Sequence, residues 1–183
     1  YGYRFFMAFN MLGFLFAGLL LPIFSKLIVE KRSVIPVSWL SFKLIYFFAF
    51  VICISIWTYK SEILNWRYGI NSSVLEHSSE TFGWLMISFI AISCNYIFGT
   101  LLTANGSLKS LNILAVFGII INVFLNLILI PKNGSVGAAF ASAFTQFFIL
   151  IIQFILCYKY FKFQYHIYSV LQVLSFTLFS IYG

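Results

Sequence analysis

Two long apolar runs joined by one short polar interruption constrain this chain more than any other feature. The first run covers residues 111–130, the second covers residues 135–157, and the sequence PKNG lies between them. Each run has about 20 residues, the length at which an α-helix crosses roughly 30 Å of hydrocarbon. The pair therefore predicts a membrane-spanning helical hairpin.

Further apolar segments of spanning length cover residues 3–24, 37–59 and 81–103, and another begins near residue 167 and runs to residue 183. The chain of 183 residues is 62% hydrophobic and 8% charged, too apolar for the surface of a soluble domain. We therefore expect an all-α integral membrane protein whose residues 1–183 form one bundle of about six transmembrane helices. We also expect the chain to be a piece of a longer protein.

The charged residues predict an orientation. Alternate connections contain seven basic residues and one acidic residue: Lys26, Glu30, Lys31, Arg32, Lys43, Lys109, Lys159 and Lys162. The opposite side is neutral overall, with Lys60, Arg67 and Lys132 against Glu62, Glu76 and Glu80. By the positive-inside rule the basic side faces the cytoplasm, which also explains the net charge of +7 without nucleic acid. We expect the opposite side to include the longest loop, residues 60–80.

Polar side chains form stripes on several of these apolar segments. Asn112, Asn122 and Asn126 share one face of the first run, and Ser142, Gln146 and Gln153 share a face of the second. Asn95 belongs to a similar stripe on the segment before them. Because amides are costly in lipid, we expect these faces to line a common wet cavity. Hydrogen bonds between helices are the alternative explanation for each residue.

Arg4 lies near the start of the first apolar segment. An arginine inside a membrane helix indicates function, and its fork of donors suits phosphate or carboxylate. A side chain that snorkels to the outer interface is the alternative.

Catalytic or metal chemistry has little basis in this sequence. The apolar segments contain no Asp or Glu, and His77 and His166 lack partners at metal-ligand or catalytic-triad spacing. The cysteines Cys53, Cys94 and Cys157 are widely spaced within apolar segments, as small buried side chains are. We expect no enzyme, no metal and no cofactor.

Residues 103–146 resemble the C-terminal half of flippases for polysaccharides and lipid-linked oligosaccharides. These proteins belong to the superfamily of multidrug, oligosaccharidyl-lipid and polysaccharide exporters. The similar features are INVFLNLILIP at residues 121–131 and a glycine followed by GAA at residues 134–139. Near the start, YRF at residues 3–5 and LPIFSK at residues 21–26 are also similar. Tyr3 stands where lipid II flippases tend to carry an acidic residue, which favours the polysaccharide branch.

The resemblance implies a transporter of two helical bundles around a central cavity that opens to alternate sides of the membrane. Its cargo would be a polyprenyl-diphosphate-linked oligosaccharide, carried across the bacterial inner membrane for surface polysaccharide synthesis. An N-terminal half of the same protein would supply the other bundle, and Arg4 would attract the diphosphate. The expected cavity residues are Arg4, Asn95, Asn112, Asn122, Asn126, Ser142 and Gln146.

Two other functions stay open at this point. A cation-coupled multidrug extruder of the same superfamily would typically need carboxylates within the membrane, and these segments have none. A structural or assembly subunit of a membrane complex would need no wet cavity.

Overall fold

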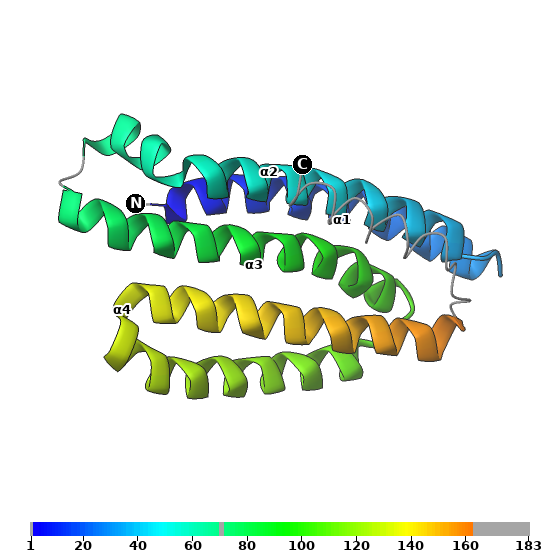
Figure 1. The fold of residues 1–183 in the computed structure, drawn as a ribbon. Coiled ribbons are helices and arrows are strands. Elements are labelled where there is room, and N and C mark those ends of the chain that lie inside the picture. The colour runs from blue at the N-terminus through cyan, green and yellow to red at the C-terminus, as the bar shows by residue number, and fades with distance from the viewer. Residues whose placement is uncertain (1, 70–71, 163–183) are drawn as a thin grey trace.

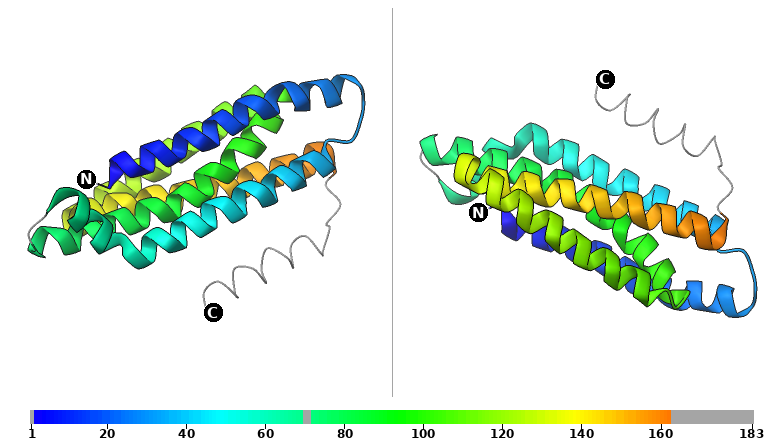
Figure 2. Two further views of the ribbon diagram at one scale, coloured as in Figure 1. Left: turned by 90° about the horizontal axis from the view of Figure 1, so that it is seen from above. Right: turned by 90° about the horizontal axis from the view of Figure 1, so that it is seen from below.

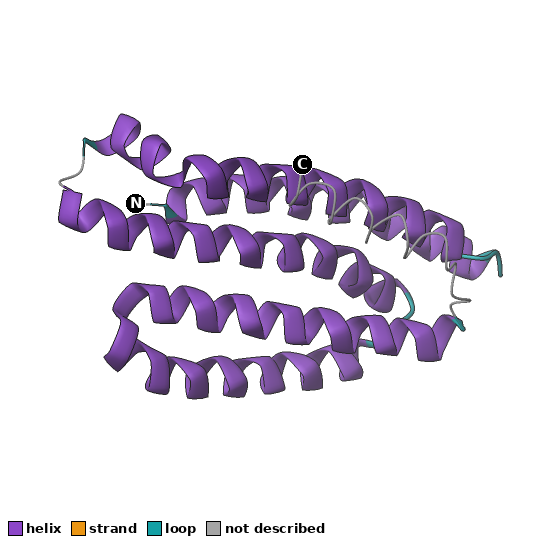
Figure 3. Ribbon diagram, viewed as in Figure 1, coloured by secondary structure: helices purple, strands orange, loops and turns teal. Residues whose placement is uncertain are grey.

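The computed structural model describes residues 2–69 and 72–162, and this part of the chain is helical throughout, without strands (Figures 1 and 3). Its helices are α1 (Tyr3–Val29), α2 (Ile35–Tyr68), α3 (Ser72–Ala104) and α4 (Leu108–Phe161). All four are long and apolar enough to cross a membrane. The structure is therefore compatible with the multi-pass membrane protein that the sequence predicts.

The predicted number of six helices is not supported. Both apolar runs belong to α4, because each of its residues except Gly134 keeps helical backbone angles. At Gly134, φ is 55° and ψ is −132°, a combination that needs glycine, and the chain reverses there (Figure 1). We call residues 108–133 the first arm of α4 and residues 135–161 the second arm. The predicted segment that begins near residue 167 lies outside the described residues.

The predicted long loop at residues 60–80 is wrong. Helix α2 runs on to Tyr68 and α3 begins at Ser72, so helix occupies most of the expected loop. Only Tyr59 interrupts α2, with φ −108° and ψ 21°. The charged residues of this stretch interrupt the apolar pattern without ending the helices. Leu64 is fully buried and fixes the protruding end of α2 to the bundle.

Helix α3 lies at the centre of the bundle. It packs against each of the other three helices, and the views in Figure 2 show it between them. Its side chains are the most buried of the four helices, with Phe82, Met86 and Leu101 fully enclosed. By contrast, α1 and α4 expose large apolar side chains such as Phe14 and Leu127, as surfaces that face lipid do.

Apolar side chains gather in two clusters along the bundle. One includes Phe6, Phe50 and Phe89, and the other includes Phe24 and Phe98. Asn10 of α1 lies in the sequence between members of the two clusters, as Asn95 does on α3. Amides thus interrupt the apolar pattern of α1 and α3, while stacked rings of Phe42, Tyr46 and Phe50 on α2 connect the two clusters.

The predicted turn at residues 104–107 is confirmed. Gly106 has φ +74°, and the Ser107 amide donates to the Leu102 oxygen at 3.0 Å. The turn reverses the chain between α3 and the first arm of α4.

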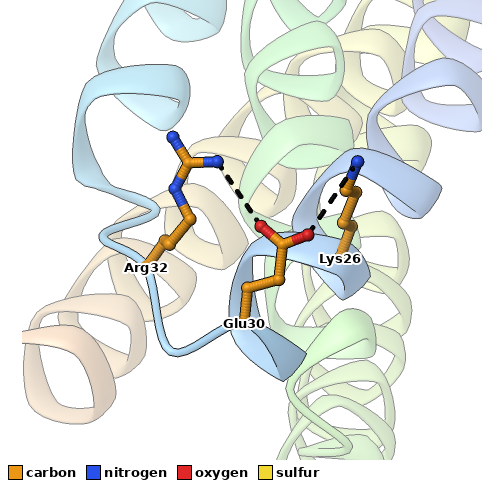
Figure 4. A network of polar contacts seen from close by, with 3 residues as sticks. All are labelled: Lys26, Glu30 and Arg32. Atoms are coloured by element: carbon orange, nitrogen blue, oxygen red, sulfur yellow. Dashed lines mark hydrogen bonds and ion pairs between the residues drawn. The ribbon is translucent and has the colours of Figure 1, made fainter.

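The basic connections lie at one end of the bundle. The α1–α2 connection, the α3–α4 turn and the end of α4 are together in Figure 1. In the first of these, Glu30 lies 3.9 Å from Lys26 and 3.4 Å from Arg32 (Figure 4). Such exposed ion pairs contribute about 1 kcal/mol or less to stability, so they do not hold the connection rigidly. This end of the bundle remains a basic surface.

Candidate functional site

A cavity of about 530 Å³ lies between α1, α3 and both arms of α4. We call it the amide cavity because four amide side chains line it, together with hydroxyl groups and an aromatic ring. Its polar lining residues are Asn10, Asn95, Tyr96, Thr100, Thr103, Gln146 and Gln153. None of the described residues that line it is charged. The cavity therefore offers polar, uncharged walls inside an apolar bundle.

Asn95 of α3 lines the amide cavity and makes hydrogen bonds to the second arm of α4. Its Nδ2 donates to the backbone oxygen of Gln146 at 3.1 Å and to Gln146 Oε1 at 3.0 Å. Nine residues separate Asn95 from Ala104, the last residue of α3, which is about 14 Å along a helix. Asn95 is therefore near the middle of a helix that spans a core of about 30 Å, and the amide cavity extends from there to Thr103, one residue from the end of α3.

Several amide oxygens around this cavity accept no hydrogen bond from the described part of the protein. They are Asn10 Oδ1, Asn95 Oδ1 and Gln153 Oε1, and each atom is buried. The side chains of Asn95 and Gln153 are themselves only 9% and 8% exposed. A buried polar atom without a partner costs about 1–3 kcal/mol. The unpaired oxygens around the amide cavity therefore lower the stability of the fold.

A second cavity of about 390 Å³ lies between the two arms of α4, and we call it the arm cavity. Asn122 Nδ2 donates to Thr145 Oγ1 at 3.3 Å across the arms, and Asn126 Nδ2 donates to Asn122 Oδ1 at 2.9 Å. Thr145 in turn donates to the Ala141 backbone oxygen at 2.8 Å. The sequence left two explanations open for Asn122, a cavity wall and a hydrogen bond between helices. Both apply, because Asn122 lines the arm cavity and also donates to Thr145 on the other arm.

The structure brings together most of the predicted cavity residues. Asn95 and Gln146 line the amide cavity, while Asn122, Ser142 and again Gln146 line the arm cavity. Asn126 lines neither, but its amide holds Asn122 in place.

Two predicted residues, Arg4 and Asn112, lie apart from these cavities. Asn112 is exposed near the start of the first arm and lines neither cavity. Arg4 is exposed in the first turn of α1, with no ion pair in the described part of the chain. It precedes Asn10 by six residues, about 9 Å along the helix and about 120° around it. Arg4 therefore does not join the amide cavity within this bundle.

Asn10 and Tyr96 are site residues that the prediction missed, and Gln153 was placed on the polar face of the second run but not among the expected cavity residues. Asn10 was detectable as an amide in the apolar segment 3–24, and Gln153 follows Gln146 by seven residues, nearly the same helix face. Tyr96 gave no signal, because its place beside the cavity depends on how α3 packs.

The titratable residues form no metal site in the part of the chain that the structure describes. No three of its His, Cys, Asp and Glu side chains come together. Cys53, Cys94 and Cys157 are free and buried, as the sequence predicts for small core side chains.

Comparison with protein-family models, with curated proteins and with solved structures gives no match. The functional argument therefore rests on the cavities themselves.

Proposed function

We propose that the chain is one bundle of a flippase that carries polyprenyl-diphosphate-linked oligosaccharide across the bacterial inner membrane. The observation that carries this proposal is an uncharged polar cavity that extends from the end of α3 to the middle of an apolar bundle. Substrate sites of secondary transporters lie near the bilayer midplane, commonly where polar side chains interrupt apolar helices. The 530 Å³ of the amide cavity falls in the usual range for small-molecule sites.

The chemistry of the cargo fits this arrangement. A sugar needs hydrogen-bonding partners on its way through hydrocarbon, and amides and hydroxyls of Asn95, Thr100 and Gln146 offer them. Buried amides that served structure alone would be expected to be satisfied within the protein, and several here are not. A second bundle, supplied by an N-terminal half of the same protein, would close the open sides of the cavities.

Arg4 has a separate role in this proposal. Its guanidinium is exposed on α1, away from the amide cavity, where it can attract the diphosphate from the membrane surface. The sugar and the diphosphate would then occupy different places on the protein.

The test uses the protein in a strain that lacks its own flippase, with wild type compared with Arg4→Ala and Arg4→Lys at matched expression. The amount of polyprenyl-linked oligosaccharide accessible at the outer leaflet is measured. We expect transport by wild type, strong loss in Arg4→Ala and partial recovery in Arg4→Lys, because lysine keeps the charge but not the fork. Transport that is unaffected by Arg4→Ala would keep the flippase proposal and exclude a role for Arg4 in binding the diphosphate.

Absence of transport for several cargoes would overturn the flippase. Drug efflux in the same cells would then favour the multidrug extruder. In the described residues Glu62, Glu76 and Glu80 lie on the protruding ends of α2 and α3, which leaves that alternative without a carboxylate at mid-depth.

A further inference from the structure

We propose that the amide cavity binds an uncharged, hydroxyl-bearing sugar unit and discriminates against anionic sugars. This inference deepens the proposed flippase function and rests on it. It assigns the neutral part of the cargo to the cavity bounded by Asn10, Asn95 and Gln153, and the diphosphate to another place.

The first argument is the kind of hydrogen-bonding group on offer. The amide oxygens of Asn10, Asn95 and Gln153 are acceptors without a protein donor. Sugar hydroxyls are donors, and they satisfy these oxygens once a side-chain rotation turns each oxygen toward the cavity, because all three are enclosed in this structure. Each unpaired oxygen that gains a donor recovers part of the free energy that its burial costs.

Gln153 is the residue best placed to respond to a ligand. Its oxygen is enclosed against α3, where a Cβ added at Gly99 would lie 3.8 Å from it and 3.5 Å from the Gln153 nitrogen. No hydrogen bond to the described protein holds this amide in position. Ligand binding turns the Gln153 side chain about its χ angles, so that its oxygen faces a sugar hydroxyl in the cavity.

The second argument is charge. The residues that line the amide cavity include neither a base to pair with a carboxylate or phosphate nor an acid to pair with a metal ion. An anion here would find neutral donors but no positive charge to compensate its own, at a large desolvation cost. The volume also exceeds many times the roughly 30 Å³ that one water occupies in the liquid, far more than a bare ion needs.

The third argument is the aromatic ring of Tyr96. This half-buried ring lines the cavity and packs edge-on against Phe14, with ring centroids 6.2 Å apart. A rigid aromatic surface beside several amides gives a sugar ring an apolar face to rest on and polar groups around its rim.

The test measures protection of a single cysteine in the intact protein in lipid nanodiscs. Ala115→Cys places a thiol at the boundary of both cavities, and Lys109→Cys, on the same arm, exposed and outside both, is the control that stays open to water. The native cysteines are buried, so unmodified protein gives the background. The rate of reaction with a membrane-impermeant maleimide is followed with maltotriose, a neutral sugar, or with trigalacturonate, an anionic sugar of equal length.

We expect maltotriose to slow labelling of Ala115→Cys but not of Lys109→Cys, and trigalacturonate to need at least about tenfold higher concentration for the same protection. Adding Gln153→Met, which keeps the side-chain shape but removes the acceptor, should raise the concentration for half-protection by maltotriose about tenfold. Because Gln153 makes no described hydrogen bond, this substitution should leave thermal stability unchanged or higher.

Several results would overturn the assignment. They are equal protection by the two sugars, no protection by maltotriose, protection by sodium ion alone, and unchanged protection in Gln153→Met. An Ala115→Cys thiol that never reacts would place the cavity against lipid and would also contradict it.

The flippase proposal can be refuted independently of the cavity assignment. Protection by maltotriose in a protein that transports no lipid-linked oligosaccharide would keep the cavity assignment and remove the flippase. Transport without protection by maltotriose would keep the flippase proposal and refute the cavity assignment.

Discussion

Asn95 Nδ2 donates to both the backbone oxygen and the side-chain oxygen of Gln146, at 3.1 and 3.0 Å, and so joins α3 to the second arm of α4. The same amide leaves its own oxygen without a protein partner. One side chain therefore both holds the bundle together and lines the amide cavity. This double position separates Asn95 from Gln153, which lines the cavity without making a described hydrogen bond.

The first prediction uses this difference. Asn95→Leu removes the donor to Gln146 and should lower the free energy of unfolding by about 1 kcal/mol, the usual scale for hydrogen bonds between membrane helices. Gln153→Met breaks no described hydrogen bond and should not lower it. Unfolding in mixed detergent micelles measures both variants. Equal loss in the two would mean that Gln153 has a structural role.

The second prediction concerns the contact between the arms of α4. A Cβ added at Gly118 would lie 2.8 Å from Ile149 Cδ1 and 3.4 Å from Ile149 Cγ1. Because Cδ1 is the far end of a flexible side chain that can shift, Gly118→Ala should destabilise the protein only modestly, by about 1 kcal/mol or less. Ile149→Val lacks the Cδ1 atom, so the double variant should recover most of that loss.

A double-mutant cycle in the same micelles measures this coupling. Gly18→Ala is the control, because an added Cβ at Gly18 meets nothing within 4 Å. A double variant no more stable than Gly118→Ala would show that the arms do not approach as closely at Gly118.

Sequence predicted the apolar hairpin well because length and hydropathy directly determine whether a helix can span. The turn at Gly134 followed from the polar PKNG sequence, and Asn122 and Gln146 followed from helical spacing. The sequence did not predict that α2 and α3 continue through residues 60–68 and 72–80. Charged residues end an apolar pattern, but they do not end a helix, since a helix can protrude into water.

The central position of α3 also had no signal in hydropathy. A helix in lipid and a helix inside a bundle are both apolar, so composition cannot tell them apart. The small residues Ser88, Ala91 and Cys94, all buried on α3, were the available indication. Tyr96 and Asn10 meet at the amide cavity only because α1 packs on α3, a choice of partner that periodicity does not specify.

The third prediction is the orientation of the bundle. Cysteines at Lys31 and Lys109 should react with an impermeant maleimide only from the cytoplasmic side, and a cysteine at Lys132 only from the opposite side. Right-side-out and inside-out vesicles distinguish the two. Labelling of Lys109→Cys and Lys132→Cys from the same side would mean that the first arm of α4 does not cross the membrane.

The fourth prediction concerns the reversal at Gly134. With φ at 55° and ψ at −132°, alanine at this position would be strained by about 1–3 kcal/mol. The added Cβ would also lie 3.3 Å from His77 Nε2 on α3. Gly134→Ala should therefore lower stability, and Asn133→Ala, in the same turn but with helical backbone angles, should not.

The effect of Gly134→Ala on the amide cavity shows whether the substitution only strains the turn or also displaces the second arm of α4. Thr81 and Ser135 join α3 to the second arm beside the turn, with hydroxyl oxygens 2.9 Å apart, and Asn95 joins them again at the amide cavity. If these contacts hold the second arm in place, Gly134→Ala loses stability but keeps maltotriose protection of Ala115→Cys. Loss of protection at a temperature where the variant is still folded would mean that Gly134, and not the contacts to α3, sets the position of the arms.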